Sequence, residues 1–163
     1  MGKRYVEVVT NKDLNKIEAL NDFCLRNDTE NVSKNILTNK ELSPVVFEDY
    51  LAYFDNEKVI DYCFIHGETD LKKGFLSFPI TLEPRKNHFF VETAVDYAFS
   101  AGLDEVSIMT KDKTLKPVLE KLGFISLGID GDVASYTLGL EDKEKGKIRI
   151  WNIWKEIVLL FCL

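Results

Sequence analysis

The sequence predicts a single α/β domain built on a mixed sheet, with helices on both faces of the sheet. Three observations lead to this prediction. Strand-like runs recur along the chain, runs with apolar residues at three- and four-residue steps lie between them, and short polar turns indicate hairpins. Hairpins give antiparallel strand pairs, whereas strand-helix-strand crossovers give parallel pairs and place helices over the sheet. We assign residues 1–140 to this domain, and residues 141–163 to a charged linker and an apolar C-terminal helix.

The first strand and the first helix follow from local periodicity. Residues 5–9 alternate around a polar residue and are rich in β-branched types, which predicts a short strand. Asn11 or Asp13 can cap a following helix that ends near Asn27. The apolar side of that helix is expected to carry Leu14, Ile17, Leu20 and Cys24.

The middle of the chain predicts a meander of strands. After a polar loop, residues 45–50 suggest a second helical segment. Residues 51–54 and 59–65 then predict two strands about a short turn. The next strand is expected over residues 73–82. It contains Pro79, which lacks the N–H that a central strand donates and therefore predicts a bulge or an unpaired point.

A crossover and a final hairpin complete the domain. Residues 87–101 carry an apolar face at helical spacing and stop at a glycine. A short strand over residues 106–109 leads to a helix over residues 115–122, with Thr114 as its expected cap. Residues 124–140 predict a hairpin about the turn Asp130-Gly131-Asp132.

The junction between the strand ending at Leu82 and the long helix is the first candidate site. It reads Glu83-Pro84-Arg85-Lys86-Asn87-His88-Phe89-Phe90. A strand-loop-helix junction presents unpaired backbone N–H groups and the positive end of a helix dipole, which together hold a phosphate or pyrophosphate. The two adjacent cations add positive charge in an acidic chain. The alternative is that they are solvated cations before an ordinary helix.

The residues at the end of the last helix carry a family resemblance. Residues 119–124, Leu-Glu-Lys-Leu-Gly-Phe, resemble the Tyr-Glu-Lys-Leu-Gly-Phe signature of the GNAT superfamily of N-acyltransferases. The similarity covers roughly residues 59–140 and includes the element order. It implies a mixed sheet of the GNAT acyl-CoA N-acyltransferase type that is splayed near the strand containing Pro79. It also implies transfer of an acetyl or other acyl group from acyl-CoA to an amine.

The resemblance also implies a set of cofactor-binding residues. Arg85 matches the first position of the family's cofactor loop, whereas His88 and Phe90 stand where small residues are usual, and Asp112 stands where the family often has Asn. Leu119 replaces the tyrosine that often protonates the departing thiolate. The implied acetyl-CoA contacts are Leu82, Arg85, Lys86, Asn87, His88, Phe89, Phe90 and Asp112.

Candidate catalytic groups are few. A backbone amide near Leu82 would polarise the thioester carbonyl, and Glu83 could accept the amine proton, directly or through water, although it could also be a solvated carboxylate. His88 could act as a base or simply be a polar first-turn residue, and His66 has no recognisable partner. No metal site is expected. The alternative function is a non-catalytic binding or regulatory protein that retains a degenerate GNAT-like fold.

Three lysines close to the last helix form a further candidate. Lys111, Lys113 and Lys116 precede or open this helix. The resemblance places them near the side from which the cofactor approaches, where they could contact its 3'-phosphate. A charge run is otherwise usually a solvated face.

Composition excludes other classes of function. The chain carries 21 Lys plus Arg against 27 Asp plus Glu, a net charge of −6, which argues against a general affinity for nucleic acid or anionic membranes. Cys24, Cys63 and Cys162 are far apart and predict no disulfide framework, which indicates a reducing cytoplasm. Neither a signal peptide nor a membrane span is expected, because the longest apolar run is about a third of the length that a spanning helix needs.

The C-terminal residues are unusually apolar and lie beyond the region of resemblance. If they are helical, one side carries Ile150, Ile153, Trp154, Ile157 and Phe161. Such a stripe has to be buried on its own domain, on a partner or on a membrane surface. Docking onto a second copy of the chain, and hence a homodimer, is the prediction made from the sequence.

Overall fold

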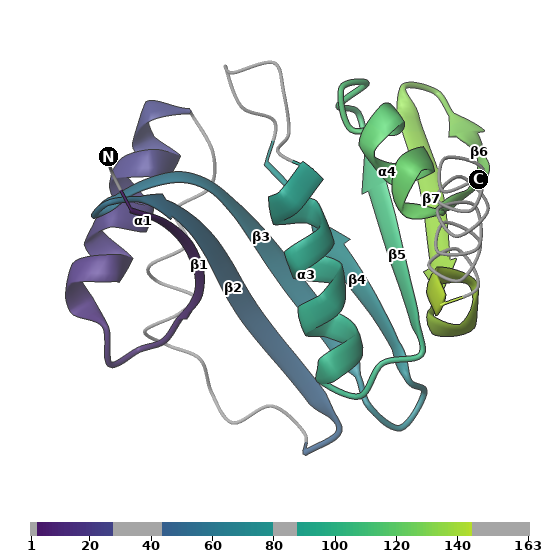
Figure 1. Cartoon of the computed structure of the whole chain (residues 1–163), viewed down its shortest axis with the longest axis horizontal. Helices are drawn as coiled ribbons and strands as arrows, with labels where there is room; N and C mark the ends of the chain where they lie inside the picture. Colours follow the sequence, from purple (N-terminus) through teal and green to yellow (C-terminus); the bar gives the residue numbers. More distant parts are fainter. Residues whose placement is uncertain (1–2, 28–43, 80–87, 145–163) are drawn as a thin grey trace, which may run out of the picture.

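Seven strands form one mixed sheet with the order β1-β2-β3-β4-β5-β7-β6 (Figure 1). The computed structural model describes residues 3–27, 44–79 and 88–144. The described elements are β1 (Arg4–Val9), α1 (Leu14–Arg26), β2 (Val46–Asp55), β3 (Lys58–Glu68), β4 (Lys73–Ser77), α3 (His88–Ser100), β5 (Glu105–Thr110), α4 (Lys116–Leu122), β6 (Ile125–Asp130) and β7 (Val133–Gly139). Among the strand pairs of this sheet, β4 and β5 are parallel and the others are antiparallel.

The sheet has an apolar core on each face. Successive residues of β2 enter opposite cores, because side chains alternate along a strand. Tyr50 and Ala52 pack with Leu20 of α1, whereas Leu51 and Tyr53 pack on the side of α3 and α4. Helices therefore cover both faces, and the predicted single α/β domain with a mixed sheet is confirmed.

Two expectations for the N-terminal half were wrong. The helical segment predicted over residues 45–50 is the start of β2, which pairs in register with β3 from Val46↔Glu68 onward. A short apolar run fits either structure, and here the long-range pairing decides. Leu14, expected on the buried side of α1, is the first residue of the helix and is 65% exposed, whereas Ile17, Leu20, Phe23 and Cys24 are buried.

The C-terminal half follows the predicted crossovers closely. Gly102 and Gly123 end α3 and α4 with positive φ angles of 100° and 92°, which glycine adopts at little cost. Pro117 lies in the first turn of α4, where its missing N–H costs nothing. The predicted cap was wrong: Leu115 occupies the N-cap position of α4, and the Thr114 hydroxyl donates to Asp112 instead.

The sheet opens between β4 and β5. Their pairing runs from Lys73↔Glu105 to Leu76↔Ile108. Strand β4 then ends at Ser77, before Pro79, while β5 continues to Thr110 along β7 only. The separation predicted near Pro79 is therefore present, although the strand is shorter than expected, and its predicted continuation over residues 80–82 lies outside the described residues.

Candidate functional site

The ends of β4 and β5 meet the start of α3 at one edge of the sheet, the upper edge in Figure 1. Parallel strands have their carboxyl ends at the same edge, and a helix that follows one of them begins there. Phe78 leaves β4 into the core and anchors the chain at this point. The arrangement brings a helix N-terminus next to the gap between two strands, as the sequence predicts for a phosphate-binding junction.

His88 is the first residue of α3 and has an unsatisfied polar atom. Its Nε2 is buried and makes no hydrogen bond within the described part of the chain, while its Nδ1 lies 3.8 Å from a carboxylate oxygen of Glu92. The first turn of α3 contains no acidic residue. The N–H groups of this turn and the helix dipole thus favour an anion, and His88 Nε2 is available as a further donor.

The bulky side chain at Phe90 points away from this helix end. Phe90 is completely buried, stacks on Tyr53 with ring centroids 5.5 Å apart, and meets Phe78 edge-on at 5.9 Å. Its bulk therefore fills the core and leaves the amides of the first turn uncovered. Phe89 is 57% exposed, and its ring centroid lies 6.3 Å from that of Tyr53.

Asp112 organises the loop after β5. Its backbone N–H donates to Thr110 Oγ1 at 2.9 Å, and its Oδ1 accepts from the N–H and the hydroxyl of Thr114, at 2.9 and 2.6 Å. These bonds hold the chain in a tight turn between β5 and α4. Asp112 thus shapes the loop on the β5 side of the gap.

The three lysines line a hollow of about 450 Å³ at the end of β5. Its floor includes Ile129 and Tyr136 from the β6–β7 hairpin. Lys111 bonds Asp132 at 3.1 Å and thereby lowers the pKa of this carboxyl below its usual range. Sequence reasoning found the lysines but missed the hollow, because its floor comes from the β6–β7 hairpin, which follows later in the chain.

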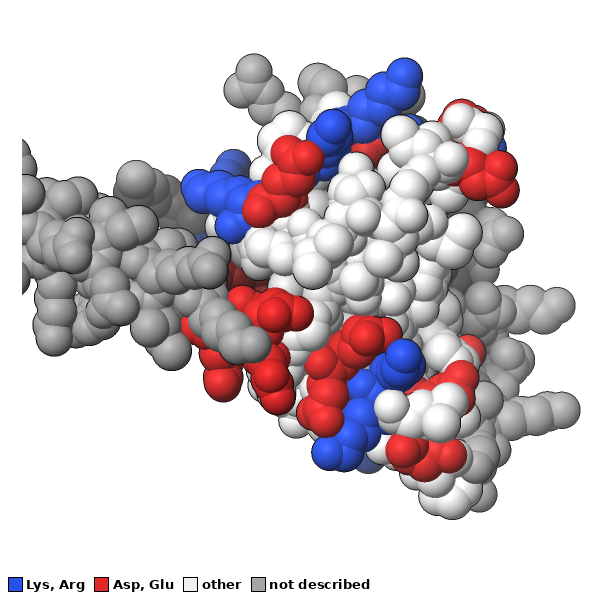
Figure 2. Space-filling model, turned by 90° about the vertical axis from the view of Figure 1, so that its right-hand side faces the viewer, with Lys and Arg blue, Asp and Glu red and all other residues white. Residues whose placement is uncertain are grey.

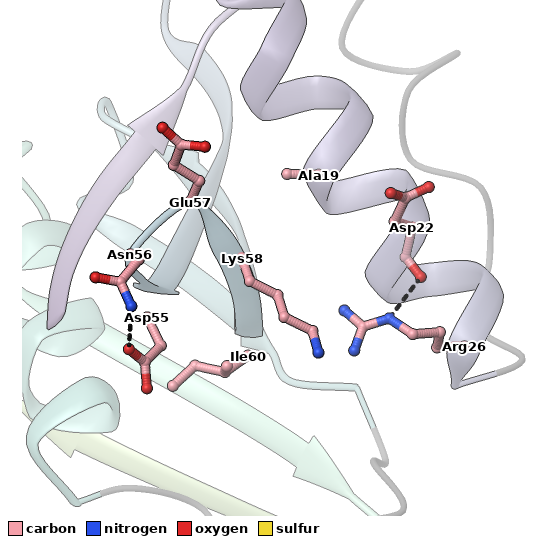
Figure 3. Close-up of a pocket in the computed structure, with 8 residues that line it drawn as sticks. All are labelled: Ala19, Asp22, Arg26, Asp55, Asn56, Glu57, Lys58 and Ile60. Atoms are coloured by element: carbon pink, nitrogen blue, oxygen red, sulfur yellow. Dashed lines mark hydrogen bonds between the residues drawn. The ribbon is translucent and has the colours of Figure 1, made fainter. Parts of the chain in front are cut away.

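A second hollow lies between the end of α1 and the β2–β3 turn. Figure 3 shows Arg26 and Lys58 reaching into it from these two elements. Arg26 donates to the carbonyl oxygens of Asp22 and Val59, at 3.1 and 3.2 Å, so it closes the end of α1 onto β3. No sequence motif pointed to this hollow.

The remaining candidates separate into three groups. His66, which had no recognisable partner in the sequence, lies 3.2 Å from Glu48 through Nδ1. Leu119 lies on α4, and its side chain is completely buried in the core that α4 shares with α3 and the sheet. The other predicted site residues lie outside the described residues, and their roles stay predictions: Leu82, Glu83, Arg85, Lys86 and Asn87.

The described residues contain neither a metal-ligand cluster nor a membrane-spanning helix. The ranges 3–27, 44–79 and 88–144 contain no group of three or more His, Cys, Asp or Glu side chains arranged to hold a metal ion. In the same part of the chain, no helix is both long enough and apolar enough to cross a bilayer.

Comparison with known proteins gives a likeness in structure alone. No family model matches the sequence, and no curated protein is significantly similar to it. Among solved structures, the acetyltransferase of the GNAT family from Streptococcus pneumoniae is 16% identical with a TM-score of 0.61, over 85% of this chain and 100% of that one. The PaiA N-acetyltransferase from Thermoplasma acidophilum, in complex with coenzyme A, is 12% identical with a TM-score of 0.61, over 84% and 99%.

A third neighbour extends the same result. The ribosomal-protein-S18-alanine N-acetyltransferase from Escherichia coli is 12% identical with a TM-score of 0.60, over 85% of this chain and 94% of that one. The chain therefore has the GNAT fold, and the resemblance predicted from residues 119–124 and the element order is confirmed at that level.

Proposed function

On the premise of the GNAT fold, we propose that this protein is an N-acyltransferase that moves an acetyl or other acyl group from acyl-CoA to an amine. The observation that carries the proposal is the separation of β4 from β5 beyond Leu76 and Ile108, beside the N-terminus of α3. A gap between parallel strands at a helix N-terminus admits an extended chain with a phosphate group at its outer end. The neighbour solved with coenzyme A supports the choice of cofactor.

The described residues at this edge fit the anionic part of coenzyme A. Among the described residues, His88 Nε2 is a buried nitrogen without a partner and can donate in the tautomer that carries its proton; the first turn of α3 has no acidic residue, and Phe90 is turned into the core. We propose that the backbone amides of residues 86–90 hold the pyrophosphate, with Arg85 and Lys86 adding charge. Leu82 and Asp112 would border the pantetheine arm. When bound, the cofactor supplies an activated thioester.

The chain's own groups would then position the reactants and move one proton. We propose that a backbone N–H near Leu82 donates to the thioester carbonyl oxygen, where negative charge develops during acyl transfer. Glu83 accepts the proton that the amine loses, directly or through one water. A thiol has an ordinary pKa near 8 to 9, so a thiolate is a tolerable leaving group at neutral pH without a general acid. The buried Leu119 takes no part in this step.

Isothermal titration with acetyl-CoA and with free coenzyme A tests binding. The chain has two histidines, which provide a matched pair of variants. His88→Ala should weaken binding about tenfold or more, since a hydrogen bond to a charged group contributes roughly 1.5–3 kcal/mol. His66→Ala, whose ring bonds Glu48, should bind like the native protein. Absence of heat at millimolar ligand would overturn the proposal.

Turnover requires a separate measurement, because binding does not establish chemistry. Release of the coenzyme A thiol is followed with amine acceptors of several classes. Glu83→Gln should depress this rate while it leaves the affinity for acetyl-CoA nearly unchanged. If both proteins have equal rates from pH 6 to 9, Glu83 is not the base.

A second candidate function is a binding or regulatory protein without catalysis. The buried Leu119 favours it, because the resembled family often has a proton-donating tyrosine at this position. This alternative predicts heat on titration with acetyl-CoA but no thiol release with any amine. For either function we propose a reducing, cytoplasmic location, in line with the reduced and buried side chains of Cys24 and Cys63.

A further inference from the structure

The outer strand β6 presents an open and apolar edge of the sheet. All six of its residues are exposed. Ile125 is 56% exposed, Leu127 65% and Ile129 75%. Proteins usually protect such an edge with lysine, proline or a covering segment, because an exposed apolar edge strand invites further pairing. β6 contains neither lysine nor proline.

On the sheet face beside this edge, the residues nearest β6 are uncharged. Val106 and Ile108 enter the core under α3, so the alternate residues of β5 face the other way. Two rows of neighbouring residues cross β5, β7 and β6 on that face: Ser107, Thr137 and Ile125, and Met109, Ser135 and Gly128. Met109 is 57% exposed. Figure 2, which views the molecule from the β6 side, shows an uncharged area with acidic and basic side chains at its borders.

From these observations we propose that residues 145–163 of the same chain cover this surface, which we call the β6 surface and define as Ile125, Leu127 and Met109. After β7, the described chain continues against α3. Residues 140–144 are helical, and Lys143 is buried, ion-paired with Asp96 and placed over the ring of Phe99 at 5.7 Å. The following residues therefore start from a fixed point close to the strand that pairs with β6.

Length and composition favour this occupant. Residues 145–163 would span about 28 Å as a helix, and β6 is about 20 Å long. From residue 148 onward the segment has three charged residues, Arg149, Lys155 and Glu156, and is otherwise almost wholly apolar. A mostly apolar segment suits a surface whose large side chains are apolar. Because the segment is tethered to the same domain, its effective concentration there is far above that of a second copy in dilute solution.

Tryptophan fluorescence of the full chain tests the proposal. The chain has two tryptophans, Trp151 and Trp154, and both lie in the proposed occupant. The native protein should emit at short wavelength and resist quenching by acrylamide. The double variant Ile125→Glu and Leu127→Glu should shift the emission toward the denatured value and increase quenching severalfold.

Matched control variants test whether the change in tryptophan emission and quenching is specific to β6. Leu25→Glu and Leu71→Glu alter side chains that are 76% and 60% exposed on other elements, and they should leave emission and quenching as in the native protein. A reciprocal variant changes only the occupant: Ile153→Asp with Ile157→Asp should accelerate hydrogen exchange at residues 125–130, with exchange in β2 and β3 unchanged. The reciprocal variant leaves β6 unchanged, so its hydrogen exchange tests the proposal even if the β6 double variant fails to fold.

Several outcomes would overturn the proposal. Native tryptophans quenched as readily as in urea would mean that the segment is solvated. Protection that disappears on dilution, with a dimeric mass by light scattering, would assign the surface to a second copy. Protection that requires anionic lipid vesicles would assign the segment to a membrane surface. Unchanged exchange at residues 125–130 in the reciprocal variant would place the segment elsewhere on the domain.

Discussion

At the scale of single residues, Leu119 shows how burial limits what a position can do. The resembled family often has tyrosine here, but the side chain of Leu119 is completely buried between α3, α4 and the sheet. Leu119→Tyr should therefore overpack the core and lower the free energy of unfolding by about 1–3 kcal/mol, without restoring a proton donor. Urea denaturation measures this. Lys121→Tyr, at an exposed position of the same helix, is the control and should be nearly neutral.

Tyr97 and Asp49 form a partly buried pair with a defined pH dependence. The Tyr97 hydroxyl donates to Asp49 Oδ2 at 2.6 Å, and burial together with this bond raises the pKa of Tyr97 well above its ordinary value. Tyr97→Phe should lower the free energy of unfolding by about 1 kcal/mol at neutral pH. Tyr97 ionises near pH 10 in the unfolded chain but stays protonated in the folded protein. The difference in free energy of unfolding between the native protein and Tyr97→Phe should therefore shrink as the pH rises above about 10.

Denaturation at pH 7 and at alkaline pH checks this prediction. Tyr5→Phe, whose ring is stacked on Phe54 at 5.0 Å, serves as the control. A difference between native and Tyr97→Phe that stays constant or grows with pH would contradict the assigned role of the hydroxyl.

Side-chain direction is the part of the site that the sequence could not predict. The junction of residues 83–90 was found from local signals, a strand followed by cations and a helix. Whether Phe90 obstructs the helix end depends on Tyr53 and Phe78, which are distant in sequence and form its pocket. The turn that Asp112 makes with Thr110 and Thr114 is likewise a matter of geometry that no spacing rule specifies.

At the scale of elements, the end of α4 depends on one glycine. Gly123 has a φ of 92°, and its N–H and that of Phe124 close the helix on Glu120 and Leu119. A Cβ at this position would meet only Leu138 at 3.8 Å, an ordinary contact, so the cost of a side chain is conformational. Gly123→Ala should destabilise the protein by about 1 kcal/mol, and Gly123→Asn by less, because asparagine tolerates this conformation better.

Thermal unfolding of the two variants tests this account. Equal losses for alanine and asparagine would show that side-chain volume, rather than backbone conformation, determines the effect.

Elements with a strong local period were predicted well, and those without one were not. The helices α1, α3 and α4 and the hairpins follow from spacing and turn residues within about 15 positions. The first part of β2 has only a short apolar run, and its pairing with residues 66–68 of β3 makes it a strand. The hollow beside Lys111 went unpredicted for a similar reason, since it needs β5, α4 and the β6–β7 hairpin together.

At the scale of the whole molecule, the segment after residue 146 should control self-association. Removing residues 147–163 would leave the β6 surface uncovered, with its three large apolar side chains exposed. The shortened chain should therefore self-associate or lose solubility, as judged by light scattering during size exclusion. An unchanged mass together with unchanged thermal stability would show that this segment is dispensable.

The short parallel pairing of β4 with β5 also has a consequence for how the molecule opens. Four residue pairs, from Lys73↔Glu105 to Leu76↔Ile108, join strands formed before residue 78 to strands formed after residue 104. The hairpins β2–β3, β3–β4 and β6–β7 join strands that are neighbours in the chain and can form early, whereas this seam must close a loop of about 30 residues. The two halves are thus expected to behave as separate cooperative units. In native-state hydrogen exchange, the amides that bridge the seam should open at a lower free energy than those between β2 and β3.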